Sequence, residues 1–224
     1  RYIQRLCGGV DSWQDESRYG LSLTLGGGEV TMLEMATAFG TLANRGIRQD
    51  LLPIVDVSDY NGKVYERNRP KRGIQAVTPG TAWIISNILS DNQARTNAFG
   101  PNSSLIISGK TVSVKTGTSN EKRDNWTIGY TPSYVAVVWV GNNDNLPMNP
   151  LLTSGVTGAA PIWHDIMTEI LKDTLDEVPI RPDTVIAIPC YFGRDEFFIK
   201  GTEPSFGRCV PLPTPTPSIS PTPS

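Results

Sequence analysis

The stretch Val112-Ser-Val-Lys115-Thr116-Gly117-Thr118-Ser119 carries the most informative pattern in the chain. Its first half alternates valine with polar residues, which is typical of a half-buried β-strand. Its second half places a cation and two hydroxyl groups around Gly117, and a glycine within a strand often marks the close approach of another backbone. We predict that this strand lies at a sheet edge and holds an extended peptide ending in a carboxylate. The peptide would pair with the strand backbone, and the cation and hydroxyls would bind its charge.

Two further strands follow at short intervals. Residues 120–125 form a polar turn, residues 126–130 a second strand and residues 134–141 a third. Such short connections join antiparallel neighbours. Lys-Thr-Gly alone is a weak signal, because a given tripeptide occurs by chance in roughly a few per cent of chains of this length. The succession of three strands makes the pattern more specific.

Helical patterns lie before and after these strands. Thr31 and Glu34 form a capping box ahead of an apolar stripe that ends at Gly46. A second helix begins at Thr78-Pro79, and a third covers about residues 160–171. We expect the following residues of the three helices to be buried: Met32, Met35, Trp83, Ile84, Ile85, Ile88, Leu89, Ile162, Trp163, Ile166, Met167 and Ile170.

Between the helices, the sequence predicts one hairpin and one loop. Asn61-Gly62 separates two strand-like segments at residues 52–58 and 63–66, which predicts a hairpin. Residues 92–102 are polar and are predicted to form a loop.

The Lys-Thr-Gly strand and its surroundings resemble the transpeptidase domain of penicillin-binding proteins, and more closely the bifunctional class A type. Other stretches that fit are Gly26-Gly27-Gly28 through Ala36, Ala43-Asn44-Arg-Gly46 and Gly158-Ala-Ala-Pro161-Ile-Trp163, while Phe197 through Pro204 resembles the family's C-terminal extension. The resemblance implies an α+β fold of the serine β-lactamase and penicillin-binding-protein type, with an antiparallel sheet flanked by helices. This chain would supply the second half of that domain.

The function implied by the resemblance is peptidoglycan D,D-transpeptidation through an acyl-serine intermediate, without a cofactor or a metal. Lys115 would act electrostatically and as a proton relay, and Thr116 and Thr118 would bind the substrate carboxylate beside Gly117. The backbone N–H of Thr118 would complete an oxyanion hole. Two alternatives stay open: a serine β-lactamase or D,D-carboxypeptidase, which transfers the acyl group to water, and a non-catalytic wall-binding module.

The domain organisation and the partners follow from composition and from the resemblance. We expect half of a transpeptidase domain at residues 1–175, an extended appendage at 176–210 and a disordered tail rich in proline, serine and threonine at 211–224. The start at Arg1 reads as the middle of a helix, so we expect a missing N-terminal portion that holds any membrane anchor. A net charge of −2 without a basic run argues against nucleic acid. The expected partners are the peptidoglycan stem peptide, a lipid-linked precursor and β-lactams, at the extracytoplasmic face of the membrane.

The nucleophilic serine and a Ser-x-Asn element of the family are expected upstream of Arg1. Ser119-Asn-Glu-Lys122 has the nucleophile spacing but lies in a charged turn, and Ser90-Asp91-Asn92 matches the second motif by letters but is expected to end a helix. Ser108-Gly-Lys110-Thr111 lacks the first glycine of a phosphate-binding loop, because Ser104 occupies that position. His164 is the single histidine, which argues against a metal site.

Four residues have structural predictions attached. If the family reading holds, an oxidising compartment favours a Cys190–Cys209 disulfide that staples the appendage, with Cys7 as a buried thiol. Asp124 could pair with a neighbouring cation at the surface or tie the turn to the strand that carries Lys115. We favour the structural role for Asp124.

Overall fold

The computed structural model describes residues 2–7, 20, 23, 26–149, 157–190 and 194–204, in two compact units. One unit spans Arg1–Arg181 and the other Pro182–Ser224. The division predicted at residue 175 stays a prediction, and the predicted tail at residues 211–224 lies outside the described residues. None of the described helices combines the length and the apolar character needed to cross a membrane.

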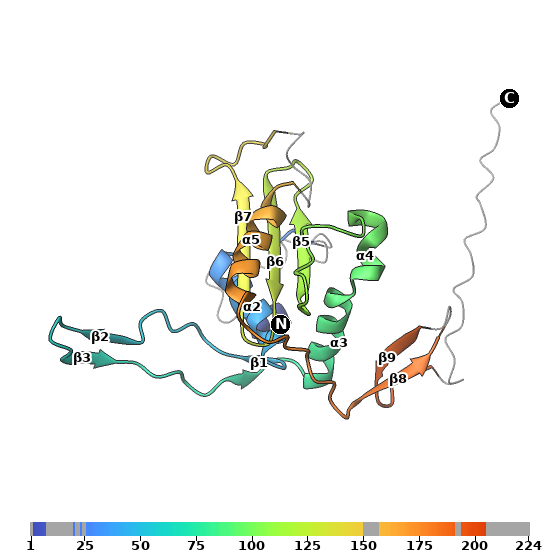
Figure 1. Cartoon of the computed structure of the whole chain (residues 1–224), viewed down its shortest axis with the longest axis horizontal. Helices are drawn as coiled ribbons and strands as arrows, with labels where there is room; N and C mark the ends of the chain where they lie inside the picture. Colours follow the sequence, from blue (N-terminus) through green and yellow to red (C-terminus); the bar gives the residue numbers. More distant parts are fainter. Residues whose placement is uncertain are drawn as a thin grey trace. The chain divides into compact units, whose positions relative to one another are not determined.

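The centre of the first unit is a three-stranded antiparallel sheet in the order β5-β6-β7 (Figure 1). Its strands are β5 (Ser113–Thr118), β6 (Asp124–Tyr130) and β7 (Val135–Gly141). The three strands expected from the sequence are therefore confirmed, although β6 begins two residues earlier than predicted. Within the described part of the chain, β5 pairs only with β6, so its other side is a free edge.

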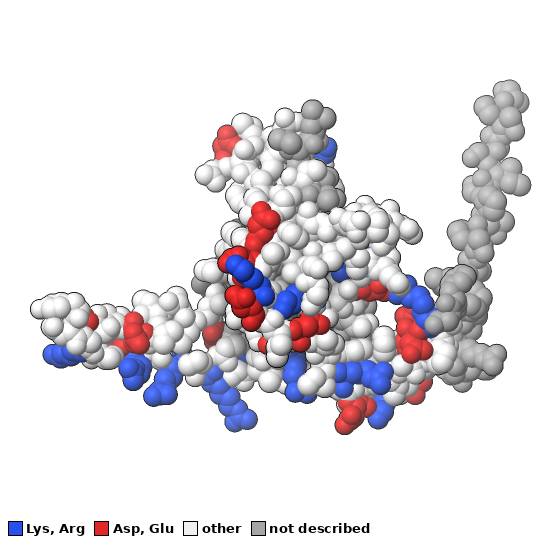
Figure 2. Space-filling view, viewed as in Figure 1, with Lys and Arg blue, Asp and Glu red and all other residues white. Residues whose placement is uncertain are grey.

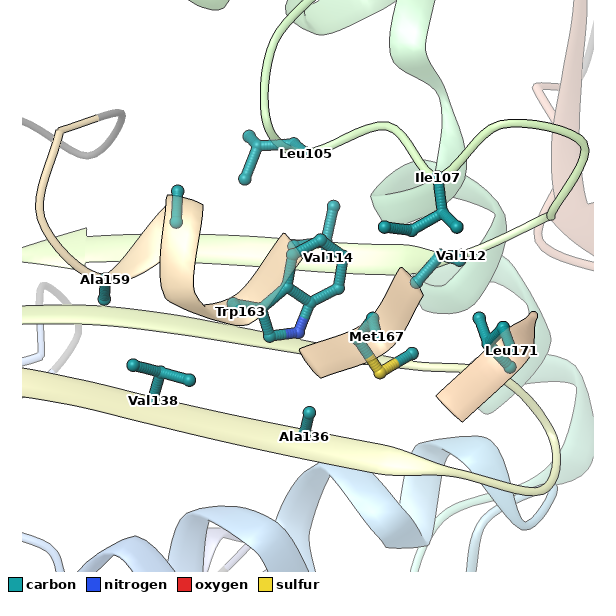
Figure 3. Packing of buried hydrophobic residues seen from close by; sticks show 11 residues of the cluster. Leu105, Ile107, Val112, Val114, Ala136, Val138, Ala159, Trp163, Met167 and Leu171 are labelled. Carbon is teal, nitrogen blue, oxygen red and sulfur yellow. The ribbon is translucent and has the colours of Figure 1, made fainter. Parts of the chain in front are cut away.

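Helix α5 (Ala159–Leu171) packs on one face of this sheet. Trp163 and Met167 are fully buried against β-strand residues such as Ala136 and Val138 (Figure 3). Gly129 makes this packing possible, because a Cβ at that position would lie 2.2 Å from the Trp163 ring. The third predicted helix is thus confirmed in extent.

The prediction that three isoleucines of α5 pack on the sheet was wrong. Ile162, Ile166 and Ile170 are all exposed. The buried stripe instead repeats every four residues through Trp163, Met167 and Leu171, and the isoleucines lie one position before each of these residues. Figure 2 shows charged side chains of both signs on the outer surface over α5, which is the solvent-facing side of that helix in this chain.

The opposite face of the sheet is covered by α2 (Met32–Ala43) and α3 (Pro79–Ser90). The Thr31 capping box is present, and Thr78 caps α3 as predicted. The predicted buried residues were partly wrong: Met32, Ile85 and Ile88 are exposed. The buried residues of α3 are Gly80, Ala82 and Ser86, which are small enough to let the helix lie close to β5.

Hydrogen bonds tie α3 to the sheet at the end of β5 away from the Lys-Thr-Gly motif. The Ser113 hydroxyl donates to Ser86 O at 2.8 Å, and the Ser86 and Tyr130 hydroxyls lie 2.8 Å apart. Burial raises the pKa of Tyr130. This network holds the start of β5 and the end of β6 against α3.

A further helix, α4 (Asn92–Phe99), occupies the segment that the sequence analysis assigned to a loop, so that prediction was wrong. Asp91 Oδ1 accepts a hydrogen bond from Ala94 N at 3.0 Å and caps the helix, and Gly100 ends it with φ of +77°. Its polar composition hides it from an apolar-periodicity test, since no residue of α4 is buried. Ser90-Asp91-Asn92 is accordingly a junction between two helices, in line with its interpretation as helix termination.

The remaining elements of the first unit are short. The predicted hairpin is confirmed as β2 (Asp56–Ser58) and β3 (Val64–Arg67), with Gly62 at φ of +82° in the turn. Strands β1 (Ile47–Arg48) and β4 (Ile74–Gln75) form a second pair, and α1 (Tyr2–Cys7) precedes them in the chain.

The second unit contains an antiparallel pair, β8 (Val185–Pro189) and β9 (Asp195–Ile199). Cys190 follows β8 and is disulfide-bonded, whereas Cys7 is free and buried. Cys209, the partner predicted for Cys190, lies outside the described residues.

Candidate active site

The Lys-Thr-Gly-Thr sequence forms the exposed end of the edge strand β5. Ser113 and Val114 are buried, whereas Lys115, Gly117 and Thr118 are exposed and Thr116 is half-buried. Strand alternation puts Lys115 and Gly117 on the face of α2 and α3, and it puts both threonines on the face of α5. The predicted site residues are therefore gathered at a free sheet edge.

Lys115 forms no ion pair with a described residue. Its Nζ donates to the carbonyl oxygen of Thr116 at 2.6 Å. A cation held beside a free strand edge can attract an anionic peptide.

Gly117 is not required by packing within the described chain. A Cβ at this position would lie 3.7 Å from Trp126 Cβ, which is an ordinary contact. The described neighbours of Gly117 therefore leave room for a side chain at this position.

The turn after β5 is closed by the hydroxyl of Ser119. Its Oγ accepts hydrogen bonds from Arg123 N at 3.0 Å and Asp124 N at 2.9 Å, and Lys122 has φ of +55°. A Ser-x-x-Lys pair needs a helix to bring the amine onto the hydroxyl, and this segment is a turn between two strands. These bonds give the Ser119 hydroxyl a structural role in the turn.

Asp124 has the structural role that we favoured, but with a different partner. Its Oδ1 accepts a hydrogen bond from Trp139 Nε1 at 3.0 Å, so the side chain joins the start of β6 to β7 and not to β5. Arg123 pairs with Glu121 at 2.6 Å. The aromatic rings of Trp126 and Trp139 lie side by side, 6.5 Å apart.

Asn125 is the residue of this site that the sequence analysis missed. It is 0 % exposed and lies opposite Thr118 in the ladder. Its Nδ2 donates to Thr118 Oγ1 at 3.0 Å, and its Oδ1 accepts from Ala159 N at 2.7 Å. No local signal in the sequence indicates this role, because the pattern places residue 125 in the polar turn before the strand, where asparagine is common.

Two other candidate motifs are occupied by structural contacts. The Lys110 amine donates to Thr174 O, and Thr111 donates to the Asp176 carboxylate through both its N–H and its hydroxyl. The Ser-Gly-Lys-Thr sequence thus anchors the chain after α5, in line with its rejection as a phosphate loop. His164 Nδ1 lies 3.5 Å from Asp165 Oδ1 on the same helix. Among the described residues there is no group of three or more His, Cys, Asp or Glu side chains placed to hold a metal ion.

Comparison with known proteins decides the family. Residues 9–168 match the family model of the penicillin-binding protein transpeptidase domain, and this range includes β5, β6, β7 and the first part of α5. The chain belongs to this family. Its α+β architecture, predicted from the resemblance, is confirmed by the helices and antiparallel sheets described above.

Curated relatives in this family are longer than the chain. Penicillin-binding protein 1A of Neisseria lactamica is 30 % identical over 184 residues, which is 80 % of this chain and 22 % of that protein. Penicillin-binding protein 1A of Aquifex aeolicus is 30 % identical over 197 residues, which is 82 % of this chain and 26 % of that protein. The chain therefore spans only about a quarter of the length of these relatives.

Solved structures of penicillin-binding proteins share the fold. Penicillin-binding protein 1A from Haemophilus influenzae superposes with a TM-score of 0.73 at 21 % identity, covering 91 % of this chain and 36 % of that one. PonA1 from Mycobacterium tuberculosis gives a TM-score of 0.64 at 26 % identity, covering 81 % of this chain and 51 % of that one. Another structure of PonA1 is a complex with penicillin V.

Proposed function

We propose that this chain is the second half of the transpeptidase domain of a class A penicillin-binding protein, and that the whole protein cross-links peptidoglycan stem peptides. The observation that carries the proposal is the exposed end of β5. Among the described residues of this chain, the edge of β5 has no strand partner on its outer side, and it presents a cation without an ion pair and a hydroxyl beside a glycine that packing does not require.

The proposed reaction is acyl transfer through a serine that lies upstream of Arg1. The serine oxygen attacks the carbonyl carbon between the two terminal D-alanines of one stem peptide. The amide C–N bond breaks, and the last D-alanine leaves with the proton on its amine. An amine of a neighbouring stem peptide then attacks the acyl-serine ester, the new amide forms, and the serine regains its proton.

The residues of β5 take the roles that its geometry allows. A peptide added along the free edge lies in the plane of the sheet, between the face of Lys115 and the face of Thr116 and Thr118. Lys115 supplies positive charge and a proton relay toward the serine. The threonine hydroxyls donate to the terminal carboxylate, and the N–H of Thr118 is one donor of the oxyanion hole. Loss of one such donor costs on the order of a hundredfold or more in rate.

The proposed partners and location follow from the same reaction. The donor is the stem peptide of peptidoglycan or of its lipid-linked precursor, and β-lactams compete for the same edge. The related PonA1 structure in complex with penicillin V supports a β-lactam as ligand. A reaction on these substrates takes place at the extracytoplasmic face of the membrane, to which an N-terminal anchor outside this chain would hold the protein.

The test uses the full-length protein and two lysine variants. Fluorescent penicillin should label the unaltered protein covalently, and product analysis with an amine acceptor should find the transferred amide. Hydrolysis alone would identify a carboxypeptidase or β-lactamase, and no labelling would leave a wall-binding module. Lys115→Ala should lose labelling. Lys172→Ala, which removes an exposed lysine at the end of α5, should label normally.

If Lys115→Ala is labelled at the unaltered rate, the proposed role of the β5 edge is wrong. The thermal stability of both variants should match that of the unaltered protein, since neither side chain is buried.

A further inference from the structure

We propose that Asn125 is a positioning residue that sets the direction of the Thr118 hydroxyl, so that this hydroxyl donates to the carboxylate of the substrate. The inference rests on the proposed function, because it takes Thr118 as a residue that contacts substrate. It assigns a role to a buried amide that touches no substrate itself.

Asn125 joins three elements through one side chain. It projects from β6 on the face of α5, and hydrogen bonds of its amide reach Thr118 at the end of β5 and Ala159 at the start of α5. With an exposed fraction of 0 %, the amide is shielded from water, so these bonds are not exchanged for bonds to solvent.

The orientation of the amide is fixed by chemistry. The backbone N–H of Ala159 can only donate, so the oxygen of the Asn125 amide must face it. The NH₂ group therefore faces Thr118. An amide nitrogen only donates, so the Thr118 oxygen accepts in this bond and cannot direct its own hydrogen toward Asn125.

The Thr118 hydroxyl hydrogen is consequently available for an acceptor outside the described chain. No described residue accepts a hydrogen bond from it, and Thr118 is exposed. A carboxylate accepts hydrogen bonds and cannot donate one. The hydroxyl is thus prepared as a donor at the point where the proposed substrate carries its negative charge.

The start of α5 is shaped to receive this amide. Gly158, the N-cap residue of α5, provides no side-chain cap, and Asn125 supplies the missing acceptor from the neighbouring strand. A Cβ at Gly158 would lie 2.4 Å from Asn125 Oδ1. The glycine therefore permits the contact, and it links the position of α5 to the direction of the Thr118 hydroxyl.

Asn125→Asp in the full-length protein separates positioning from structural support. An ionised aspartate still accepts from Ala159 N–H, and its charge is favourable at a helix N-terminus. However, it also accepts from the Thr118 hydroxyl, which turns the hydroxyl hydrogen inward and the oxygen lone pairs toward the substrate. We expect the second-order rate constant for acylation by fluorescent penicillin to fall about tenfold, or about 1.4 kcal/mol.

The pH dependence of the acylation rate of this variant distinguishes a positioning role from a purely structural one, because only the positioning role predicts that the defect changes with pH. A protonated aspartate donates to Thr118 as asparagine does, so the defect should shrink as the pH falls through the pKa of the introduced carboxyl group. The defect should also vanish in a Thr118→Val background, where no hydroxyl remains to be directed. Thr127→Val, at another fully buried position two residues along β6, is the matched control and should leave acylation unchanged.

Gly158→Ala is a second variant in case Asn125→Asp fails to fold. Its methyl group would displace the amide oxygen without altering β5, and it should also slow acylation only when Thr118 is present. The Asn125 role is refuted if Asn125→Asp acylates at the unaltered rate, loses activity independently of pH, or loses as much in the Thr118→Val background. If the unaltered protein is not labelled by penicillin at all, the proposed function fails and this inference fails with it.

Discussion

Gly129→Ala tests whether the sheet and α5 fit together as described. The substitution adds one methyl group on the face of β6 that α5 covers. Its Cβ would lie 2.2 Å from Trp163 Cζ2, 2.7 Å from Cε2 and 3.0 Å from Nε1. Real Cβ atoms do not approach other atoms so closely, so the ring or the helix has to shift.

The expected cost follows from how little room Trp163 has. Its exposed fraction is 0 %, and its neighbours Met167 and Ala160 are equally buried. Inserting a methyl group into such a core costs about 1–3 kcal/mol. Because three contacts fall on one fully buried ring, we expect about 2–3 kcal/mol, which lowers Tm by roughly 4–12 °C for a domain of this size.

Gly117→Ala is the matched control in the same sheet. Its Cβ would meet only Trp126 Cβ, at 3.7 Å. Replacing an unstrained glycine by alanine stabilises by about 0.4–1 kcal/mol, through the unfolded chain. The two variants therefore add the same group to adjacent strands and should change the stability in opposite directions.

Differential scanning calorimetry of the full-length protein measures both effects. The unfolding transition of the transpeptidase domain is the one whose Tm rises when penicillin is bound. A Trp163→Leu background should remove most of the cost of Gly129→Ala, since the clashing atoms are gone. A Gly129→Ala protein with unaltered Tm would refute the described packing of α5. An equal cost in both backgrounds would show that the indole is not the cause.

Three further predictions concern the site and the second unit. Gly117→Val should fold but lose acylation by penicillin, because its side chain would push a bound peptide away from Thr118 N–H; normal labelling would disprove strand pairing at β5. Cys190 and Cys209 should be joined by a disulfide worth roughly 3 kcal/mol in the chain-entropy model, and non-reducing digestion with mass spectrometry should recover the linked peptides and not two alkylated cysteines. The chain expressed alone should not be labelled by fluorescent penicillin, and a labelled band that disappears in Ser119→Ala would identify Ser119 as the nucleophile and contradict the hydrogen bonds that close its turn.

Local patterns in the sequence determined the elements that carry the site. Alternation of apolar and polar residues marked the motif strand, and short polar connections indicated the two strands that follow it. The Thr31 capping box and Thr78-Pro79 located the starts of α2 and α3. These features depend on neighbours within about one helical turn or one hairpin, so they can be predicted without the fold. The function of the Lys-Thr-Gly strand was inferred from its resemblance to a known family, because a tripeptide by itself occurs too often by chance to identify a site.

Tertiary structure decided which face of each helix is buried and which polar residues meet. The sequence offered two apolar stripes on α5, and the sheet selected the one with Trp163 because Gly129 leaves space for the indole. The sequence likewise did not show that Asn125 contacts both Thr118 and Ala159, since the contact to Ala159 joins residues 34 positions apart. Long-range contacts of this kind depend on the register of strands and the approach of a helix, and no local pattern in the chain encodes either one.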